Sequence, residues 1–217
     1  MAAPASATSL DGSSFDGAGI DGPVYLDVVH AAQAAPGWFD RAVSAYSGYG
    51  LAVFAALMVY GWWRARGRGD QDWAVRALAA PVLTVLAFLV SAALKLQVRE
   101  LRPCQSLRVV TLEACPAAGD WSFPSNHATI AAAAAVALWF VSARLGLVAS
   151  VCALAMAASR VWVGAHYPHD VAAGLAVGAA VAVSLGLLVR GFAPALAGLI
   201  PGPVRTFALG PAREASA

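Results

Sequence analysis

Five long apolar stretches dominate the chain, and short polar segments separate them. Each stretch approaches the roughly 20 residues that an α-helix needs to cross the hydrocarbon core of a bilayer. The pattern therefore predicts an all-α membrane protein, a polytopic helical bundle with about five transmembrane helices. The predicted spans cover residues 44–63, 74–96, 127–143, 145–163 and 170–189.

The segment 24–43 shows a weaker helical pattern in which apolar and polar positions alternate, and it contains Trp38 and Phe39. Aromatic side chains of this kind suit the boundary between lipid and water. We expect an amphipathic interfacial helix that lies on the outer membrane surface before the first span. A sixth span is the alternative.

The two ends of the chain are predicted to lie outside the membrane domain, which covers residues 24–190. Residues 1–23 are small and polar and have no basic stretch ahead of an apolar core, so a disordered tail is predicted and not a signal peptide. Residues 191–217 contain four prolines, and their apolar portion is too short and too interrupted for a span. They are predicted to form a cytoplasmic C-terminal tail.

The composition fits the same class of protein. Hydrophobic residues make up 60% of the chain and charged residues only 12%, whereas a soluble domain carries about 25% charged residues. The formal net charge of +2 is too small to indicate a nucleic-acid partner.

The distribution of basic residues favours one orientation of the bundle. With five spans and the N-terminus outside, the outer side keeps three basic residues once Lys95, Arg102 and Arg160 are assigned to a site. Because cytoplasmic loops carry an excess of Lys and Arg, the turn at 64–76 is predicted to be cytoplasmic. The eight arginines of the inner side are Arg64, Arg66, Arg68, Arg76, Arg144, Arg190, Arg205 and Arg213.

Two of the three cysteines, Cys104 and Cys115, fall in the long outer loop at 97–126. An oxidising compartment permits a disulfide there, and closing a loop of this size would stabilise the fold by about 3 kcal/mol. We predict this disulfide, with two free thiols as the alternative. Cys152 lies in the middle of a span and is predicted to be a small buried apolar residue.

Three polar clusters interrupt the apolar pattern, and the predicted topology places all three on the outer side. The first contains Lys95 and Arg102, the second covers 121–127, and the third covers 159–170. Ionisable groups at a membrane edge are costly and mark a functional site. Within the second cluster Ser125 precedes an alanine-rich run, which predicts a helix start whose backbone N–H groups attract phosphate.

Together the clusters supply three cations, Lys95, Arg102 and Arg160, and the hydroxyl of Ser125. This set suits phosphoryl transfer, because the transferred group carries negative charge on several oxygens and catalysis depends mostly on positioning and electrostatic stabilisation. Arginine also binds phosphate through two parallel hydrogen bonds. Since the cations can take the electrostatic role of Mg²⁺, neither a metal nor another cofactor is expected.

Two histidines and an aspartate divide the remaining roles. His166 lies four residues before Asp170, whose carboxylate can hold the imidazole in the tautomer that leaves one nitrogen free to attack phosphorus. His127 can protonate the leaving oxygen. A zinc site of His127, His166, His169 and Asp170 is conceivable, but the three cations would repel Zn²⁺ and attract an anion.

These residues resemble the three-part signature of the type 2 phosphatidic acid phosphatase (PAP2) superfamily. The resemblance implies a membrane hydrolase, a metal-independent phosphatase or diphosphatase of lipid phosphates. The three parts are Lys95 with Arg102-Pro103, then Pro124-Ser125-Asn126-His127, then Ser159-Arg160 with His166 and Asp170.

The resemblance also implies a role for each residue. It makes His166 the nucleophile that forms a phosphohistidine, Asp170 its partner and His127 the general acid. Family members commonly have Gly or Asp at position 126, where this chain has Asn. Because its backbone N–H remains available, we expect activity to survive and substrate preference to differ. Phosphate binding is assigned to Lys95, Arg102, Ser125, Asn126 and Arg160.

Within the superfamily, the surface helix, the five-span layout and the phrase Ser122-Phe123-Pro124-Ser125 look most like the bacitracin-resistance type of undecaprenyl-diphosphate phosphatase. This implies removal of the terminal phosphate of an undecaprenyl or decaprenyl diphosphate, which recycles the carrier lipid of cell-wall biogenesis. The site would face the extracytoplasmic side of a bacterial-type plasma membrane. The implied partners are the lipid substrate and the bilayer, and the pattern specifies no oligomeric state.

Other readings stay open. The same chemistry would serve phosphatidylglycerophosphate, phosphatidic acid, diacylglycerol pyrophosphate or a polyprenyl-phosphoribose phosphate. A membrane protein that binds or moves lipid phosphates without turnover would keep the cations but would not need His127, His166 and Asp170. A phosphatase of soluble substrates is a third class. The haloperoxidase relatives of the superfamily are soluble, which this apolar chain does not fit.

Overall fold

The computed structural model describes residues 14–211, and this part of the chain is built from helices. The helices are α1 (Ala18–Ala34), α2 (Gly37–Tyr49), α3 (Leu51–Gly67), α4 (Gln71–Val98), α5 (Pro103–Ser106), α6 (Asn126–Trp139), α7 (Ala143–Trp162), α8 (Pro168–Leu199) and α9 (Gly202–Leu209). The all-α prediction is therefore confirmed.

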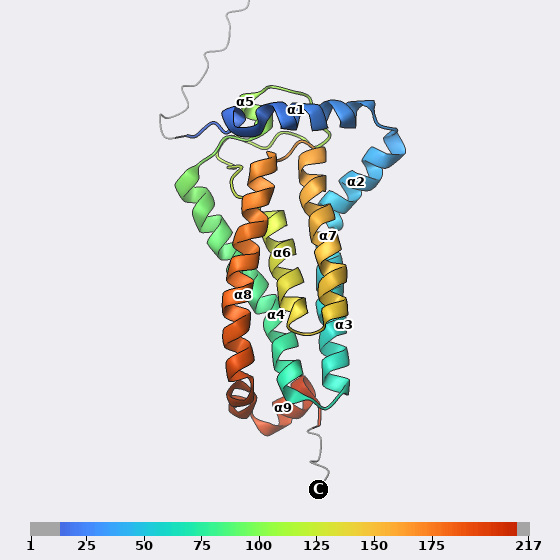
Figure 1. Cartoon of the computed structure of the whole chain (residues 1–217), viewed down its shortest axis with the longest axis vertical. Helices are drawn as coiled ribbons and strands as arrows, with labels where there is room; N and C mark the ends of the chain where they lie inside the picture. The colour runs from blue at the N-terminus through green and yellow to red at the C-terminus, as the bar shows by residue number, and fades with distance from the viewer. Residues whose placement is uncertain (1–13, 212–217) are drawn as a thin grey trace, which may run out of the picture.

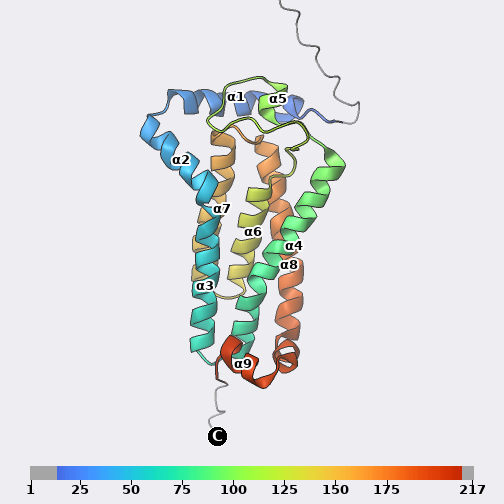
Figure 2. The same ribbon diagram turned by 180° about the vertical axis from the view of Figure 1, so that it is seen from behind.

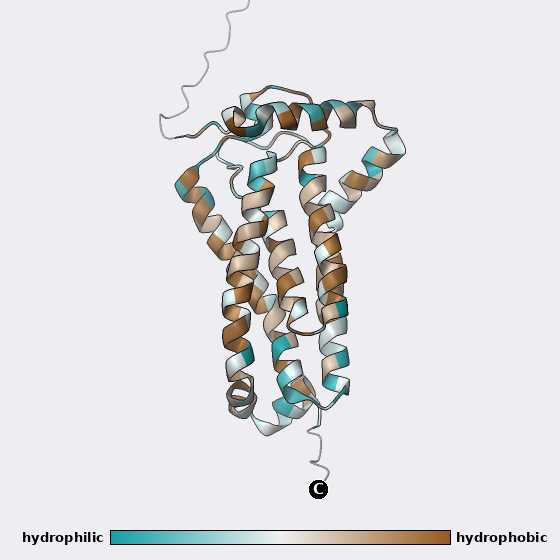
Figure 3. Ribbon diagram, viewed as in Figure 1, coloured by the Kyte–Doolittle hydropathy of each residue, from teal (hydrophilic) through white to brown (hydrophobic). Residues whose placement is uncertain are grey.

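Helices α3, α4, α6, α7 and α8 run along the long axis of the molecule, and α6 packs against α4, α7 and α8 (Figures 1 and 2). Helix α1 lies across one end of this bundle together with α5, and α9 lies at the other end. The shafts of the long helices are mostly hydrophobic, whereas hydrophilic residues gather toward the two ends (Figure 3). This distribution is typical of a bundle whose sides face lipid.

Three helices, α4, α7 and α8, are each long and apolar enough to cross a membrane. Helices α2 and α3 pass the same test only as a pair, and they meet at an angle of 54° around Gly50. Helix α6 has 14 residues, or about 21 Å, which is shorter than the roughly 30 Å of a hydrocarbon core. The chain is a multi-pass membrane protein, although length and composition support only three or four of the five predicted spans.

The prediction for the N-terminal region needs two corrections. The predicted interfacial segment 24–43 is two helices, with the break between Ala34 and Gly37. Residues 18–23, assigned to a disordered tail, form the first turns of α1. The physical reason is tertiary packing, since the buried side chains of Tyr25 and Val29 join a cluster with residues of α7 and α8. The first 13 residues of the predicted tail lie outside the described residues.

The prediction for the C-terminal region is also wrong in part. Helix α8 continues through Pro194 to Leu199, ten residues beyond the predicted span, and α9 follows it. Ala193 and Ala197 pack against side chains of α3 and α4, so the bundle extends the helix where sequence alone suggested a tail. Residues 212–217 lie outside the described residues.

Small residues bring α6 and α8 into close contact. A methyl group added to Gly178 would lie 2.2 Å from the carbonyl oxygen of Thr129, and one added to Gly174 would lie 2.5 Å from the carbonyl oxygen of Ser125. In membrane bundles, small residues permit this approach of backbones. The approach also lets the Ser125 backbone N–H donate to the Asp170 carbonyl at 3.0 Å, which fixes the start of α6 against the start of α8.

We expect Gly178→Ala to destabilise the protein by about 1–3 kcal/mol, because the added methyl group must push α8 away from the α6 backbone. The measurement is thermal unfolding of the purified protein in detergent micelles. Gly191→Ala is the matched control on the same helix, where an added methyl group meets nothing within 4 Å. Equal unfolding temperatures for the two variants would contradict this account of the α6–α8 contact.

Candidate active site

A cavity of about 380 Å³ lies at the end of the bundle that α1 and α5 cover. It gathers side chains from α4, α6, the end of α7 and two loops. Six of the eight residues proposed from sequence as catalytic or phosphate-binding line it: Lys95, Arg102, Asn126, His127, Arg160 and His166. The other two, Ser125 and Asp170, are fully buried beside it.

Lys95 reaches the cavity from the last turn of α4 and is only 9% exposed. Its ammonium group donates to the carbonyl oxygen of Trp121 and, at 3.2 Å, to that of Ser122. A buried ammonium group is tolerated only when its donors are satisfied. The backbone near the end of the long loop therefore holds this cation in place.

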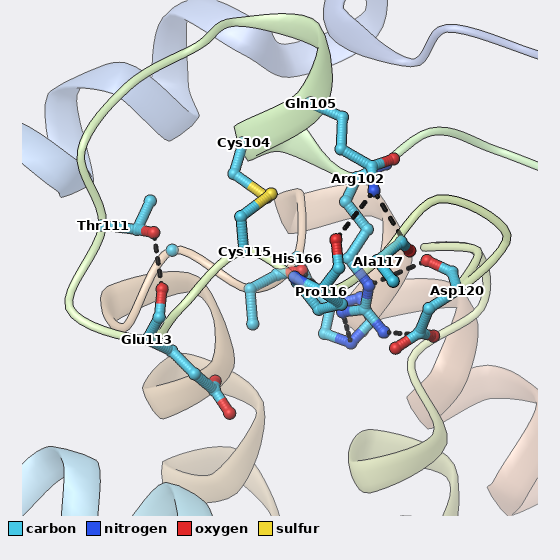
Figure 4. Close-up of a disulfide and its surroundings, with 12 residues drawn as sticks. Arg102, Cys104, Gln105, Thr111, Glu113, Cys115, Pro116, Ala117, Asp120 and His166 are labelled. Atoms are coloured by element: carbon cyan, nitrogen blue, oxygen red, sulfur yellow. Dashed lines mark hydrogen bonds and ion pairs between the residues drawn. A yellow bond between two sulfur atoms is a disulfide. The ribbon is translucent and has the colours of Figure 1, made fainter. Parts of the chain in front are cut away.

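Arg102 precedes α5 and is 6% exposed. Its guanidinium donates to Asp120 through Nη2 at 2.9 Å and to the carbonyl oxygen of Ala165 through Nη1 at 2.9 Å. The same Nη1 lies 3.3 Å from Nε2 of His166. Figure 4 shows this guanidinium between the loop that carries Asp120 and the imidazole of His166.

Arg160 lies in the last turn of α7 and is 5% exposed. Its Nη1 donates to Ser47 Oγ at 2.5 Å and pairs with a carboxylate oxygen of Glu113 at 2.9 Å. Ser47 belongs to α2, so the tilted helix before the 54° bend supplies one of the groups that orient this cation.

His166 and Asp170 form the pair that the four-residue spacing predicted. Nδ1 of His166 lies 3.4 Å from Oδ2 of Asp170 and 3.3 Å from the hydroxyl of Ser122. The carboxylate also accepts hydrogen bonds from the Ser122 hydroxyl at 2.5 Å and from the Tyr167 backbone N–H at 2.8 Å. Because Arg102 can only donate, its contact with Nε2 indicates the tautomer with the proton on Nδ1.

Helix α6 starts where the sequence predicts, with Ser125 before its first residue. The Ser125 hydroxyl is buried and has no hydrogen-bond partner. The Asn126 side chain turns toward α4 and accepts a hydrogen bond from Ser91 at 2.8 Å. The cavity therefore meets the N-terminus of a helix whose free N–H groups favour an anion.

His169 does not join the cavity. Its Nδ1 lies 2.7 Å from Asp21 and its Nε2 lies 2.8 Å from Glu100. The considered zinc set of His127, His166, His169 and Asp170 is therefore not gathered around one point. Within residues 14–211, the residues close enough to share an ion are instead Glu100, His169 and Asp170.

The contacts of His169 fasten α1 over the site. Asp21 of α1 also accepts a hydrogen bond from the His169 backbone N–H at 2.7 Å. Tyr25 of the same helix is fully buried and donates to the carbonyl oxygen of Gly164 at 2.9 Å. Burial raises the pKa of Glu100, and its hydrogen bond to His169 acts in the opposite direction.

Cys104 and Cys115 are joined by a disulfide in the loop above the cavity (Figure 4). The segment between them carries Glu113, and Pro116 and Ala117 directly after it accept hydrogen bonds from the Gln105 side chain at 3.1 and 3.4 Å. The disulfide therefore restrains the loop that supplies the carboxylate partner of Arg160. Cys152 is half-buried and unpaired in a span.

The electrostatics of the cavity favour a neutral imidazole at His166. Burial lowers the pKa of His166 to about 3; the hydrogen bond to Asp170 opposes this shift, and the charges of Arg102 and Lys95 add to it. For Asp120, burial would raise the pKa, but the hydrogen bond and charge of Arg102 hold it below its usual value. At neutral pH the cavity thus combines an uncharged nitrogen base with fixed cations.

Sequence reasoning missed the residues that orient this set. Ser122 bonds Asp170, Ser47 bonds Arg160, and Asp120 bonds Arg102. Ser122 lies in the conspicuous segment just before α6, but the sequence does not indicate which residue its hydroxyl would bind. Ser47 is 113 residues away from Arg160 in the chain, so only the fold reveals this pairing.

Comparison with known proteins gives the family. The PAP2 superfamily profile matches residues 76–192, more than half of the chain, and this protein belongs to that superfamily. It is 30% identical over 159 residues to the undecaprenyl-diphosphatase BcrC of Bacillus subtilis (strain 168), which covers 73% of this chain and 77% of that protein. The family and its phosphatase members place the chain among the lipid phosphatases, as the sequence predicts.

The names of other relatives indicate different lipid substrates. A decaprenylphosphoryl-5-phosphoribose phosphatase of Mycobacterium tuberculosis (strain ATCC 25618 / H37Rv) is 36% identical over 52% of this chain and 59% of its own length. A lipid A 1-phosphatase of Rhizobium johnstonii is 53% identical over 27% of this chain and 24% of its own. The crystal structure of a PAP2 type phosphatidylglycerolphosphate phosphatase from Bacillus subtilis shares the fold with a TM-score of 0.52 at 20% identity, over 81% of this chain and 87% of that chain.

The depressed pKa of His166 predicts how stability varies with pH. Because the pKa is about 3 in the folded protein and about 6.5 in an unfolded chain, the unfolded state binds more protons between these values. Stability therefore rises with pH in this window, and lowering the pH from 7.5 to 5.5 should cost about 1 kcal/mol through this residue.

The check is thermal unfolding in micelles at both pH values for the unmodified chain and for His166→Gln. The variant should lose less stability on acidification than the unmodified chain. His30→Gln, on an exposed position of α1, is the matched control and should keep the full loss. A His166→Gln variant with the same pH dependence as the unmodified chain would contradict the prediction.

Proposed function

We propose that this member of the PAP2 superfamily removes the terminal phosphate of a polyprenyl diphosphate, of the undecaprenyl or decaprenyl type, through a phosphohistidine. One observation carries the proposal: His166 lines a cavity together with three buried cations, its Nε2 lies 3.3 Å from one of them, Arg102, and its Nδ1 is held by Asp170 and Ser122. A site for lipid-phosphate binding alone would need the cations but not an oriented nucleophile.

The phosphate would bind where the three cations converge, with Lys95, Arg102 and Arg160 as electrostatic partners. Two of them now hold carboxylates of the long loop, Asp120 on Arg102 and Glu113 on Arg160. The side chains of these carboxylates are 52% and 46% exposed. Because each carboxylate is accessible to solvent, water can hydrate it once it leaves its arginine, and a phosphate can take its place on the buried cation. The α6 N-terminus and the unpartnered Ser125 hydroxyl add donors.

The reaction follows from this arrangement in two steps. The negative charge of the bound diphosphate favours the protonated form of His127. The Nε2 lone pair of His166 attacks the terminal phosphorus, the bond from phosphorus to the bridging oxygen breaks, and His127 donates its proton to the leaving lipid phosphate. Asp170 stabilises the positive imidazole ring that forms. Water then attacks the phosphohistidine, His127 takes its proton, and inorganic phosphate leaves.

Membrane placement supports a lipid substrate. The cavity lies at one end of the bundle, and Phe88 and Ile130 contribute apolar side chains to the same wall as the cations. A polyprenyl chain can therefore remain in the bilayer while its headgroup reacts. We assign this end to the extracytoplasmic face of the bacterial plasma membrane, because the arginine-rich loops lie at the other end.

The choice of a polyprenyl diphosphate rests on similarity to BcrC over most of both chains. A polyprenyl-linked phosphoribose phosphate is the second candidate, favoured by the 36% identity to the mycobacterial phosphatase. Both candidates share a polyprenyl tail and an attached phosphate. In either case the cavity must bind a phosphate group whose lipid tail stays in the bilayer. Carrier-lipid recycling in cell-envelope synthesis is the role that fits the first.

The test is phosphate release from undecaprenyl diphosphate by the purified full chain with EDTA present. We expect EDTA-resistant release that falls by about 10³-fold or more in His166→Ala, because the nucleophile is lost. His30→Ala, an exposed histidine of α1, is the matched control and should keep full activity. Turnover of phosphatidylglycerophosphate but not of undecaprenyl diphosphate would change the assigned substrate. Absence of phosphate release from every lipid phosphate would contradict the proposed enzymatic function.

A second variant tests the support behind the nucleophile. Ser122→Ala removes the hydroxyl that donates to Asp170 at 2.5 Å, and partners of this kind typically contribute 10- to 100-fold. We expect kcat to fall by about tenfold with little change in KM, since Ser122 does not line the cavity. A raised KM with unchanged kcat would show that Ser122 serves substrate binding instead.

A further inference from the structure

A second cavity, of about 730 Å³, lies at the opposite end of the bundle from the candidate active site. It opens where the end of α3, the start of α4 and the turn between α6 and α7 meet. Its polar lining consists largely of four arginines: Arg64, Arg68, Arg76 and Arg144. Neither the catalytic proposal nor the family signature uses any of them.

The lining of this cavity contains no carboxylate, and within residues 14–211 none of the four arginines forms an ion pair. Arg64 bonds the hydroxyl of Tyr60 at 3.1 Å, and Arg68 lies 4.6 Å from the ring centre of Trp73. Aromatic contacts orient a guanidinium but do not neutralise it. Asp70, the nearest acidic residue in sequence, accepts a hydrogen bond from the Trp73 backbone N–H and caps α4.

Arg76 is the innermost of the four. Its side chain is half-buried, and its Nε is buried with no hydrogen-bond partner among the residues that the structure describes. It also lines an adjoining cavity of about 520 Å³ together with Arg190, Trp139 and Phe140. A buried guanidinium donor without an acceptor is costly. The position therefore indicates an anion that the protein itself does not supply.

The remaining lining shows which kind of anion fits. Tyr60 and Trp139 are each 48% exposed, and Val148 is 50% exposed, so apolar and aromatic surface adjoins the basic cavity. Such a combination of guanidinium groups and interfacial aromatic rings suits a headgroup whose acyl chains stay in the bilayer. A freely soluble anion would gain nothing from the apolar side of the wall.

We propose that this cavity, formed by α3, α4 and the α6–α7 turn, binds the phosphate-bearing headgroup of an anionic phospholipid. The charge bias of membrane loops requires arginines on one side of the bilayer, but it does not require four of them around one cavity without a carboxylate. The bound lipid joins α3, α4 and the α6–α7 hairpin at one end of the bundle. The site is independent of the lipid phosphatase reaction at the other end.

The test is native mass spectrometry of the full chain in detergent, titrated with phosphatidylglycerol and, separately, with phosphatidylcholine of the same acyl chains. We expect phosphatidylglycerol to bind at least about tenfold more tightly. The double variant R76Q/R144Q should lose about tenfold or more of this affinity, because each phosphate contact to an arginine is charge-assisted. Arg205→Gln, on α9 and outside the cavity, is the matched control and should bind as the unmodified chain does.

Equal affinity for the two lipids, or an unchanged affinity in R76Q/R144Q, would overturn the proposal. Two further arms identify the occupant. Millimolar inorganic phosphate that displaces the lipid completely would make this a site for soluble anions and would overturn the lipid assignment. A chain ending at Pro211 should bind the lipid as the full chain does; a tenfold gain would make residues 212–217 the occupant and would overturn it as well.

Discussion

Three cations buried at one end of an apolar bundle set the main constraint on this structure. Lys95, Arg102 and Arg160 are each less than a tenth exposed, and an unsatisfied charge in such a place would cost several kcal/mol. Backbone carbonyl groups of Trp121 and Ser122 accept hydrogen bonds from Lys95, and that of Ala165 accepts one from Arg102. The long loop supplies two of these acceptors to Lys95.

The same constraint explains why the helices beneath the site are lined with small residues. The proposed catalytic and phosphate-binding groups come from α4, α6, α7 and α8 and from the loops before α5 and α8, so these elements must be held at close and constant distances. Five consecutive alanines, residues 131–135, lie on α6 and are nearly all fully buried. Glycines at positions 174 and 178 of α8 complete the contact. Close backbone packing thus replaces large side chains as the means of positioning.

Sequence predicted most of the residues that meet at the cavity because their arrangement depends on local spacing. The four-residue step from His166 to Asp170 and the helix start after Ser125 are short-range features, and both appear in the structure. The helix ends were predicted less well. Residues 18–23, 191–199 and 202–209 are helical, with contacts to distant parts of the bundle, and no local pattern reports such contacts. The partners Ser47 and Asp21 were missed for the same reason.

The shortness of α6 has a consequence for how a lipid meets the cavity. Helix α6 has 14 residues, and in Figure 1 its upper end lies lower than the upper ends of α7 and α8. This end is the N-terminus of α6, which carries Ser125 and His127, so the helix start is recessed toward the middle of the bundle. A phosphate bound at this floor would lie between the long helices and not on the end surface of the bundle. The length of α6 thus sets how deep the site lies along the axis of the bundle.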